Sequence, residues 1–153
     1  MNVTIIEVIK GMLAPGIMIS ACGLLLLGMN NKYSLVVNRI RTLNSEFRDL
    51  DKEQSNRRDC ILAQLPLLIE RMKLIRNTVW LYTVGIAMFI LSIFILGIYS
   101  FVEYNQSLNI VAFVIFIAAL IAVVTGVLYA AKEVRLGYKI VRIETNNILY
   151  IEE

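Results

Sequence analysis

The 153-residue chain contains no histidine and only two cysteines and two prolines. Without histidine it lacks the side chain that most often serves as a general base or a metal ligand near neutral pH. It also has no glycine-rich phosphate loop followed by Lys and Ser or Thr, no Cys/His metal spacing and no nucleophile beside a base. We therefore expect a protein that is not an enzyme and that needs no cofactor and no metal.

Charged residues are also missing from three long stretches, at 11–29, 79–102 and 108–131. About 20 helical residues are enough to cross a hydrocarbon core of roughly 30 Å. Hydrophobic residues make up 58% of the sequence and the mean hydropathy is +0.70, more than a soluble domain of this size can bury. The sequence predicts an all-α membrane protein with three transmembrane helices, at about 11–30, 78–102 and 108–131.

The lack of charge inside these stretches also bears on transport. Intramembrane carboxylates, lysines and histidines are the groups that form proton relays, and the chain has none of them there. A proton-driven pump built on this chain alone is therefore not expected.

An intrachain disulfide is excluded as well, because Cys22 lies in the middle of the first stretch and Cys60 in the polar region that follows it.

The distribution of Lys and Arg predicts the orientation. Ten of the fifteen cations lie between 32 and 76, four lie between 132 and 142, and only Lys10 lies on the other side of the predicted membrane. Short segments rich in Lys and Arg stay in the cytoplasm. We expect the N-terminus outside the cell and the C-terminus in the cytoplasm.

The polar segments carry apolar residues at alternating steps of three and four, which is typical of coiled-coil seams. One seam has Val36, Ile40, Leu43, Phe47 and Leu50, a second has Ile61, Leu65, Leu68, Met72, Ile75 and Val79, and a third has Val134, Tyr138, Val141, Thr145 and Ile148. The polar residues 51–58 predict a reversal between the first two. We expect a cytoplasmic antiparallel helical hairpin over about 31–77, with a kink or a helix start at Pro66, and a C-terminal helix over about 132–153 whose seam packs on the hairpin.

Small residues recur at every fourth position of the third predicted span, at Ala118, Ala122, Gly126 and Ala130. Such residues let helix backbones approach closely in lipid. This ladder predicts helix packing, either within one protomer or between protomers.

The first predicted span has small residues close to one face, followed by a leucine and two amides. The candidate pore-facing residues are Gly16, Ser20, Gly23, Leu27, Asn30 and Asn31. In a ring of protomers they would form a narrow, weakly polar path with a hydrophobic constriction. Ordinary helix packing is the alternative interpretation of the same residues.

Cations in the cytoplasmic region are candidates for contact with a protein partner or with anionic membrane lipids: Arg39, Arg41, Arg71, Lys73 and Arg76. Six acidic residues are interleaved with the cations of 32–76, and the predicted topology already requires positive charge on this side. No nucleic acid partner is expected.

The run from Leu13 to Lys32, together with Val37 to Asn44, resembles a family of small bacterial membrane proteins catalogued as the domain of unknown function 2721 family. The shared pattern is a proline-started first span, an Asn-Lys/Arg exit and an Arg-Ile-Arg-x-Leu helix. The resemblance covers most of the chain and implies three spans in a bacterial inner membrane, but it brings no activity with it. Lys32 stands where relatives carry Arg.

Two functional hypotheses follow. In the first, the protein is a homo-oligomer of the inner membrane, forming a passive ion-conducting pore lined by the first helix. In the second, it is a membrane-anchored scaffold whose cytoplasmic helices bind a partner protein or anionic lipid. In the scaffold, the small-residue face of the first span would be filled by the other helices of the same protomer.

Overall fold

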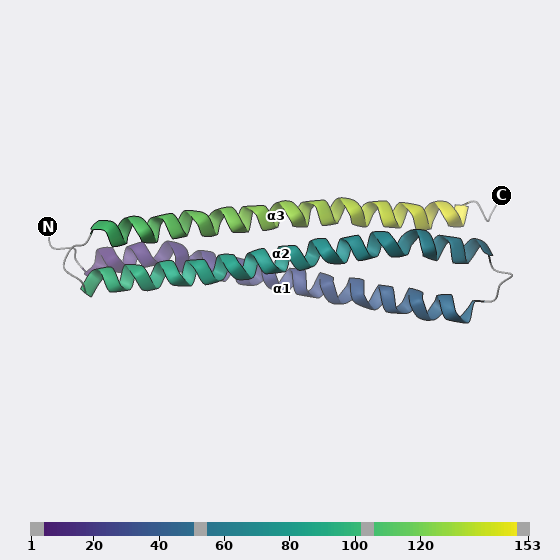
Figure 1. The fold of residues 1–153 in the computed structure, drawn as a ribbon, viewed down its shortest axis with the longest axis horizontal. Coiled ribbons are helices and arrows are strands. Elements are labelled where there is room, and N and C mark those ends of the chain that lie inside the picture. The colour runs from purple at the N-terminus through teal and green to yellow at the C-terminus, as the bar shows by residue number, and fades with distance from the viewer. Residues whose placement is uncertain (1–4, 51–54, 102–105, 150–153) are drawn as a thin grey trace. The chain divides into compact units, whose positions relative to one another are not determined.

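The computed structural model consists of three long α-helices and describes residues 5–50, 55–101 and 106–149 (Figure 1). Helix α1 spans Ile5–Asp49, α2 spans Ser55–Phe101 and α3 spans Gln106–Leu149, with lengths of 45, 47 and 44 residues. Every element within the described ranges is helical, which confirms the predicted all-α fold class.

Each helix is long and apolar enough to cross a membrane. Large apolar side chains point away from the protein on all three helices: Leu24 of α1 is 73% exposed, Phe94 of α2 66% and Ile121 of α3 62%. Exposing so many apolar side chains to water is unfavourable, whereas a lipid bilayer solvates them at little cost. These features indicate a multi-pass membrane protein.

The helices contribute to two compact units. The first unit consists of Met1–Gly28 and Val79–Val127, and the second consists of Met29–Thr78 and Leu128–Glu153. Each helix therefore supplies one segment to each unit.

Two glycines bring α2 and α3 close together in the first unit. A Cβ atom added to Gly85 would lie 2.8 Å from Cγ2 of Val123, and one added to Gly126 would lie 2.6 Å from Cε1 of Tyr82. Real Cβ atoms do not approach other carbon atoms so closely. A side chain at either position would therefore force Val123 or Tyr82 to move, and glycine permits the close contact between the helices.

The remaining contacts between α2 and α3 in the first unit show that the two helices run antiparallel. The rings of Phe89 and Phe116 pack at 5.5 Å between centroids with a 55° tilt. The buried hydroxyl of Ser92 donates a hydrogen bond of 3.0 Å to the carbonyl oxygen of Ala112. As the residue number rises in α2, that of its partner in α3 falls.

The buried face of α3 in this unit differs from the predicted ladder. Of Ala118, Ala122, Gly126 and Ala130, only Gly126 is buried and the alanines are half-buried. Residues four apart drift by about 40° around a helix, whereas residues seven apart drift by only about 20°. Among the described side chains of α3 in this unit, Ala112, Ala119, Val123 and Gly126 are buried, and Ala112, Ala119 and Gly126 follow the seven-residue spacing.

Buried residues recur at the same interval in the second unit. Cys60, Gln64 and Thr78 of α2 are buried as well, and the residues at the seven-residue interval are Met29, Val36 and Leu43 in α1, Ile61, Leu68 and Ile75 in α2, and Glu133 and Ile140 in α3. The α1 and α2 positions belong to the seams predicted there, apart from Met29, which extends the first seam by one interval.

The seam predicted for the C-terminal helix is wrong as a packing surface within the protomer. Val134, Tyr138 and Val141 are 57%, 74% and 61% exposed, and Thr145 is exposed as well. Ile148 lies outside the residues whose side chains the structure describes. The reason is geometric: α3 buries Ala112, Ala119 and Gly126, and the same face of a regular helix next reaches Glu133, about 100° from Val134.

Neither proline ends a helix. Pro15 lies inside α1 and is buried, while Pro66 lies inside α2 and is exposed. The helix start considered at Pro66 is therefore wrong, because α2 begins at Ser55 and continues through it. Proline near the start of a helix is tolerated best, and Pro66 lies in the fourth turn, where it removes one backbone hydrogen bond.

The close contact at Gly126 predicts a specific sensitivity. Gly126→Ala forces Tyr82 to move and should lower the free energy of unfolding by about 1–3 kcal/mol, the typical cost of overpacking. Gly23→Ala is the matched control, since nothing lies within 4 Å of a Cβ atom there. Denaturation in detergent micelles, followed by circular dichroism, compares the two variants. Equal stabilities would contradict this assignment of Gly126.

Candidate functional site

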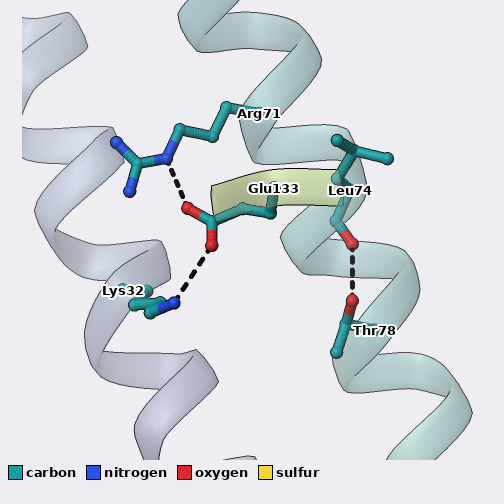
Figure 2. Close-up of polar contacts among 5 residues, drawn as sticks. All are labelled: Lys32, Arg71, Leu74, Thr78 and Glu133. Carbon is teal, nitrogen blue, oxygen red and sulfur yellow. Dashed lines mark hydrogen bonds and ion pairs between the residues drawn. The ribbon is translucent and has the colours of Figure 1, made fainter. Parts of the chain in front are cut away.

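A fully buried carboxylate is the most distinctive polar feature of the second unit. Glu133 of α3 has 0% of its side chain exposed. Its Oε2 atom lies 3.1 Å from Nζ of Lys32 on α1, and its Oε1 atom accepts a hydrogen bond from Nε of Arg71 on α2. Figure 2 shows both cationic side chains directed at this carboxylate, so the cluster takes one residue from each helix.

The helix surface around Glu133 is shaped for the Arg71 guanidinium. Gly137 lies one turn further along α3, and a Cβ atom there would lie 3.3 Å from Cζ of Arg71 and 3.5 Å from each of its two Nη atoms. A larger side chain would crowd the guanidinium. The buried hydroxyl of Thr78 donates to the carbonyl oxygen of Leu74 at 3.0 Å (Figure 2), so it is satisfied on its own helix.

The cluster holds helices in place. An isolated buried charge costs several kcal/mol in lost hydration, and only close, hydrogen-bonded partners offset that cost. The carboxylate of Glu133 finds these partners only when Lys32 and Arg71 are both in position. With no exposed surface on its carboxylate, Glu133 is placed to join the three helices.

A second ion pair joins the end of α1 to the start of α2 in the second unit. Nε of Arg57 donates to Oε1 of Glu46 at 2.6 Å, and the guanidinium of Arg58 lies 4.6 Å from the ring centroid of Phe47. The hydrogen bond and charge of Arg57 lower the pKa of Glu46. This pair is part-exposed and is expected to contribute little to stability.

The candidate pore-facing residues lie on a face of α1 that the other helices do not cover. Ser20, Leu27, Asn30 and Asn31 are exposed, and Gly16 and Gly23 are half-buried. A Cβ atom at either of these glycines would meet nothing within 4 Å. In the first unit the buried residues of α1 are instead Pro15 and Cys22. Packing within the protomer therefore does not account for the small residues of this face.

The candidate contact cations are dispersed. Arg41, Lys73 and Arg76 are exposed in the second unit, and Arg39 is half-buried. The guanidinium of Arg71 is engaged with Glu133. Contact of these residues with lipid or a partner protein remains a prediction.

Sequence reasoning missed Glu133, although the sequence carries a signal for it. Seven-residue steps from Ala112 through Ala119 and Gly126 lead to this residue, so the packed face of the third span continues onto a carboxylate. The apolar residues one position further along, at Val134 and Val141, predicted a different face. Within the described residues, no three His, Cys, Asp or Glu side chains come together as they would to hold a metal ion.

These features define the class: a helical multi-pass membrane protein whose three helices meet at a buried ion cluster. A family model described as "Protein of unknown function (DUF2721)" matches residues 12–143. The chain therefore belongs to this family, and the resemblance seen in the sequence is confirmed. No curated protein and no solved structure matches the chain.

The cluster predicts a large effect of removing its carboxylate. Glu133→Ala leaves two part-exposed cations facing each other without their shared hydrogen-bonded carboxylate and should cost about 1–3 kcal/mol of unfolding free energy. Asp49→Ala is the control, because this carboxylate is exposed on α1 and its loss should change stability by less than about 0.5 kcal/mol. Denaturation in micelles measures both, and an equally small loss for Glu133→Ala would show that the cluster does not hold the helices.

Proposed function

We propose that this protein is a non-enzymatic homo-oligomer of the bacterial inner membrane that forms a passive ion-conducting pore lined by α1. The uncovered small-residue face of α1 is the observation that carries this proposal. Space next to Gly16 and Gly23 is open in the first unit, and Leu27 is 60% exposed. Small residues that no helix of the same protomer contacts are suited to line a surface shared among protomers.

The chemistry of this face suits passive conduction. It carries no ionisable group, and the Ser20 hydroxyl donates to the carbonyl oxygen of Gly16 at 3.5 Å on its own helix. Leu27 would form a hydrophobic constriction that opens and closes by wetting. The amides of Asn30 and Asn31 would provide a polar rim.

The orientation of the protein in the membrane is part of the same proposal. The N-terminus lies outside and the second unit lies in the cytoplasm, as an antiparallel coiled-coil hairpin with a C-terminal helix. Fourteen of the fifteen cations support this orientation, and the Glu46–Arg57 pair between α1 and α2 supports the hairpin.

The orientation predicts which positions can be labelled from outside the cell. A cysteine placed at Ser107 should react with a membrane-impermeant thiol reagent on intact cells, whereas one placed at Asn44 should not.

A pore lined by α1 predicts that polarity at the constriction controls flux. In liposomes containing the purified protein, Leu27→Asn should increase ion flux severalfold over the native chain, because a polar ring stays hydrated. Leu25→Asn is the matched control: it is also exposed, but it lies about 160° around the helix from Leu27. An oligomer that shows no flux for the native chain and for Leu27→Asn, under any ionic condition, would exclude the pore.

A scaffold is the second candidate function. The exposed side chains of Arg41, Lys73 and Arg76 in the second unit favour it, since they are available to an acidic partner or to anionic headgroups. Crosslinking in cells should then recover one abundant cytosolic protein, and Arg41→Glu should abolish its recovery. Arg48→Glu, an exposed cation outside the candidate set, is the control. Recovery that is insensitive to Arg41→Glu would exclude this form of the scaffold.

A further inference from the structure

A cavity of about 260 Å³ opens between the three helices of the first unit. Its wall includes Pro15 of α1, Leu96 of α2 and Phe116 of α3, and the ring of Phe116 packs in turn on that of Phe89. Apolar cavities of about 150 Å³ already hold a molecule of the size of benzene. The cavity is therefore large enough for a segment of a hydrocarbon chain.

The residues that line the cavity lie near one end of each uncharged stretch. Gly11 is the first residue of the first stretch, Asn109 is the second residue of the third, and Leu96 lies in the last third of the second. A contact between Met12 and Gly97 joins α1 to α2 close to the same level. The cavity thus lies where the hydrocarbon of a bilayer meets its polar headgroups, and the molecules present there are amphipathic lipids.

A proline gives the cavity a hydrogen-bond acceptor that its own helix does not fill. Pro15 lies inside α1, which begins at Ile5, and because proline has no N–H the carbonyl oxygen of Gly11 loses its helical donor. Helix carbonyls point toward the C-terminal end, so this oxygen is directed from Gly11 toward Pro15, and both residues line the cavity. A backbone acceptor without a donor is costly within a membrane. A ligand that donates a hydrogen bond there removes this cost.

Two polar side chains line the same cavity. The hydroxyl of Ser92 already donates to the carbonyl oxygen of Ala112 at 3.0 Å. Asn109 is exposed, and its amide can both donate and accept hydrogen bonds. The cavity therefore combines apolar walls with one backbone acceptor and one amide.

We propose that this cavity binds an acyl lipid that carries a free hydroxyl group. The hydroxyl donates to the carbonyl oxygen of Gly11, the amide of Asn109 donates to the ester carbonyl of the lipid, and the acyl chain lies against Leu96 and Phe116. No acidic residue lines the cavity among the described residues, so a neutral hydroxyl suits it better than an ammonium group. The site requires only the three membrane-spanning helices and not a pore.

A photoreactive lipid tests the site. Monooleoylglycerol with a diazirine in its acyl chain, added to the native protein in detergent micelles and irradiated, should label residues within 92–96 or 109–116, as read by mass spectrometry of peptides. Unlabelled monooleoylglycerol should compete. Methyl oleate has the ester but no hydroxyl, and at equal mole fraction in the micelles it should compete about two- to tenfold less well, the effect of one hydrogen bond. Equal competition by the two lipids would overturn the proposal.

Filling the cavity distinguishes the site from general contact with lipid. Ala14→Trp adds a large side chain at an exposed residue of the wall and should reduce the labelling severalfold. Ala21→Trp is the matched control, because Ala21 is also exposed on α1 but does not line the cavity. Circular dichroism checks that both variants are helical. Labelling that Ala14→Trp leaves unchanged would come from bulk lipid only, and the site would then be wrong.

Restoring the missing N–H tests the role of the Gly11 carbonyl. Pro15→Ala supplies the helical donor to this oxygen, so monooleoylglycerol and methyl oleate should then compete equally. Pro66→Ala changes the proline inside α2, which lies in the second unit and outside the cavity, and should keep the preference for the hydroxyl. A full preference retained in Pro15→Ala would contradict the proposed hydrogen bond.

Discussion

Residues seven apart on an α-helix differ by only about 20° in direction, so a helix that packs along its length buries residues at this interval, and much of the structure depends on this constraint. In the first unit it selects Ala112, Ala119 and Gly126 of α3, where small residues let α2 approach closely. The next positions on that face are Glu133 and Ile140. A carboxylate is therefore buried in the second unit, and Lys32 and Arg71 are needed to compensate its charge.

The same constraint separates what the sequence could predict from what it could not. The three membrane-spanning segments were predicted directly, because a long stretch without charged residues is stable in an apolar solvent. Many of the buried residues of α1 and α2 in the second unit, such as Leu43 and Ile75, were predicted as well, because the apolar seam there is also the packed face. The buried Gln64 and Thr78 of α2 lie outside the predicted seams. In α3 the two differ: the more apolar face, at Val134 and Val141, is exposed, and the buried face includes Glu133.

Choosing between those two faces requires information that lies outside the C-terminal segment. Hydrophobicity alone favours Val134 over Glu133, since an unpaired buried carboxylate is unfavourable. The partners that make its burial tolerable are 101 and 62 residues away in the chain. The candidate pore-facing residues are equally hard to interpret from sequence. Small residues indicate close packing, but they do not show which helix packs against them. Gly126 faces Tyr82 of its own protomer, whereas Gly16 and Gly23 face nothing within it.

The uncovered surfaces of the protomer include the small-residue face of α1 and the apolar seam of α3 at Val134, Tyr138 and Val141. The first carries no ionisable group, and the second lies near the exposed cations Arg135 and Arg142. The helices of the protomer thus satisfy its buried charge while these apolar faces stay open to lipid or to another protein.

The order in which the residues of the ion cluster occur along the chain has a consequence for biosynthesis. Lys32 and Arg71 are made first, and Glu133 follows only when the third apolar stretch is complete. A chain that stops before Glu133 carries two cations with no carboxylate to join them. The ion cluster therefore cannot form until the third apolar stretch has been synthesised.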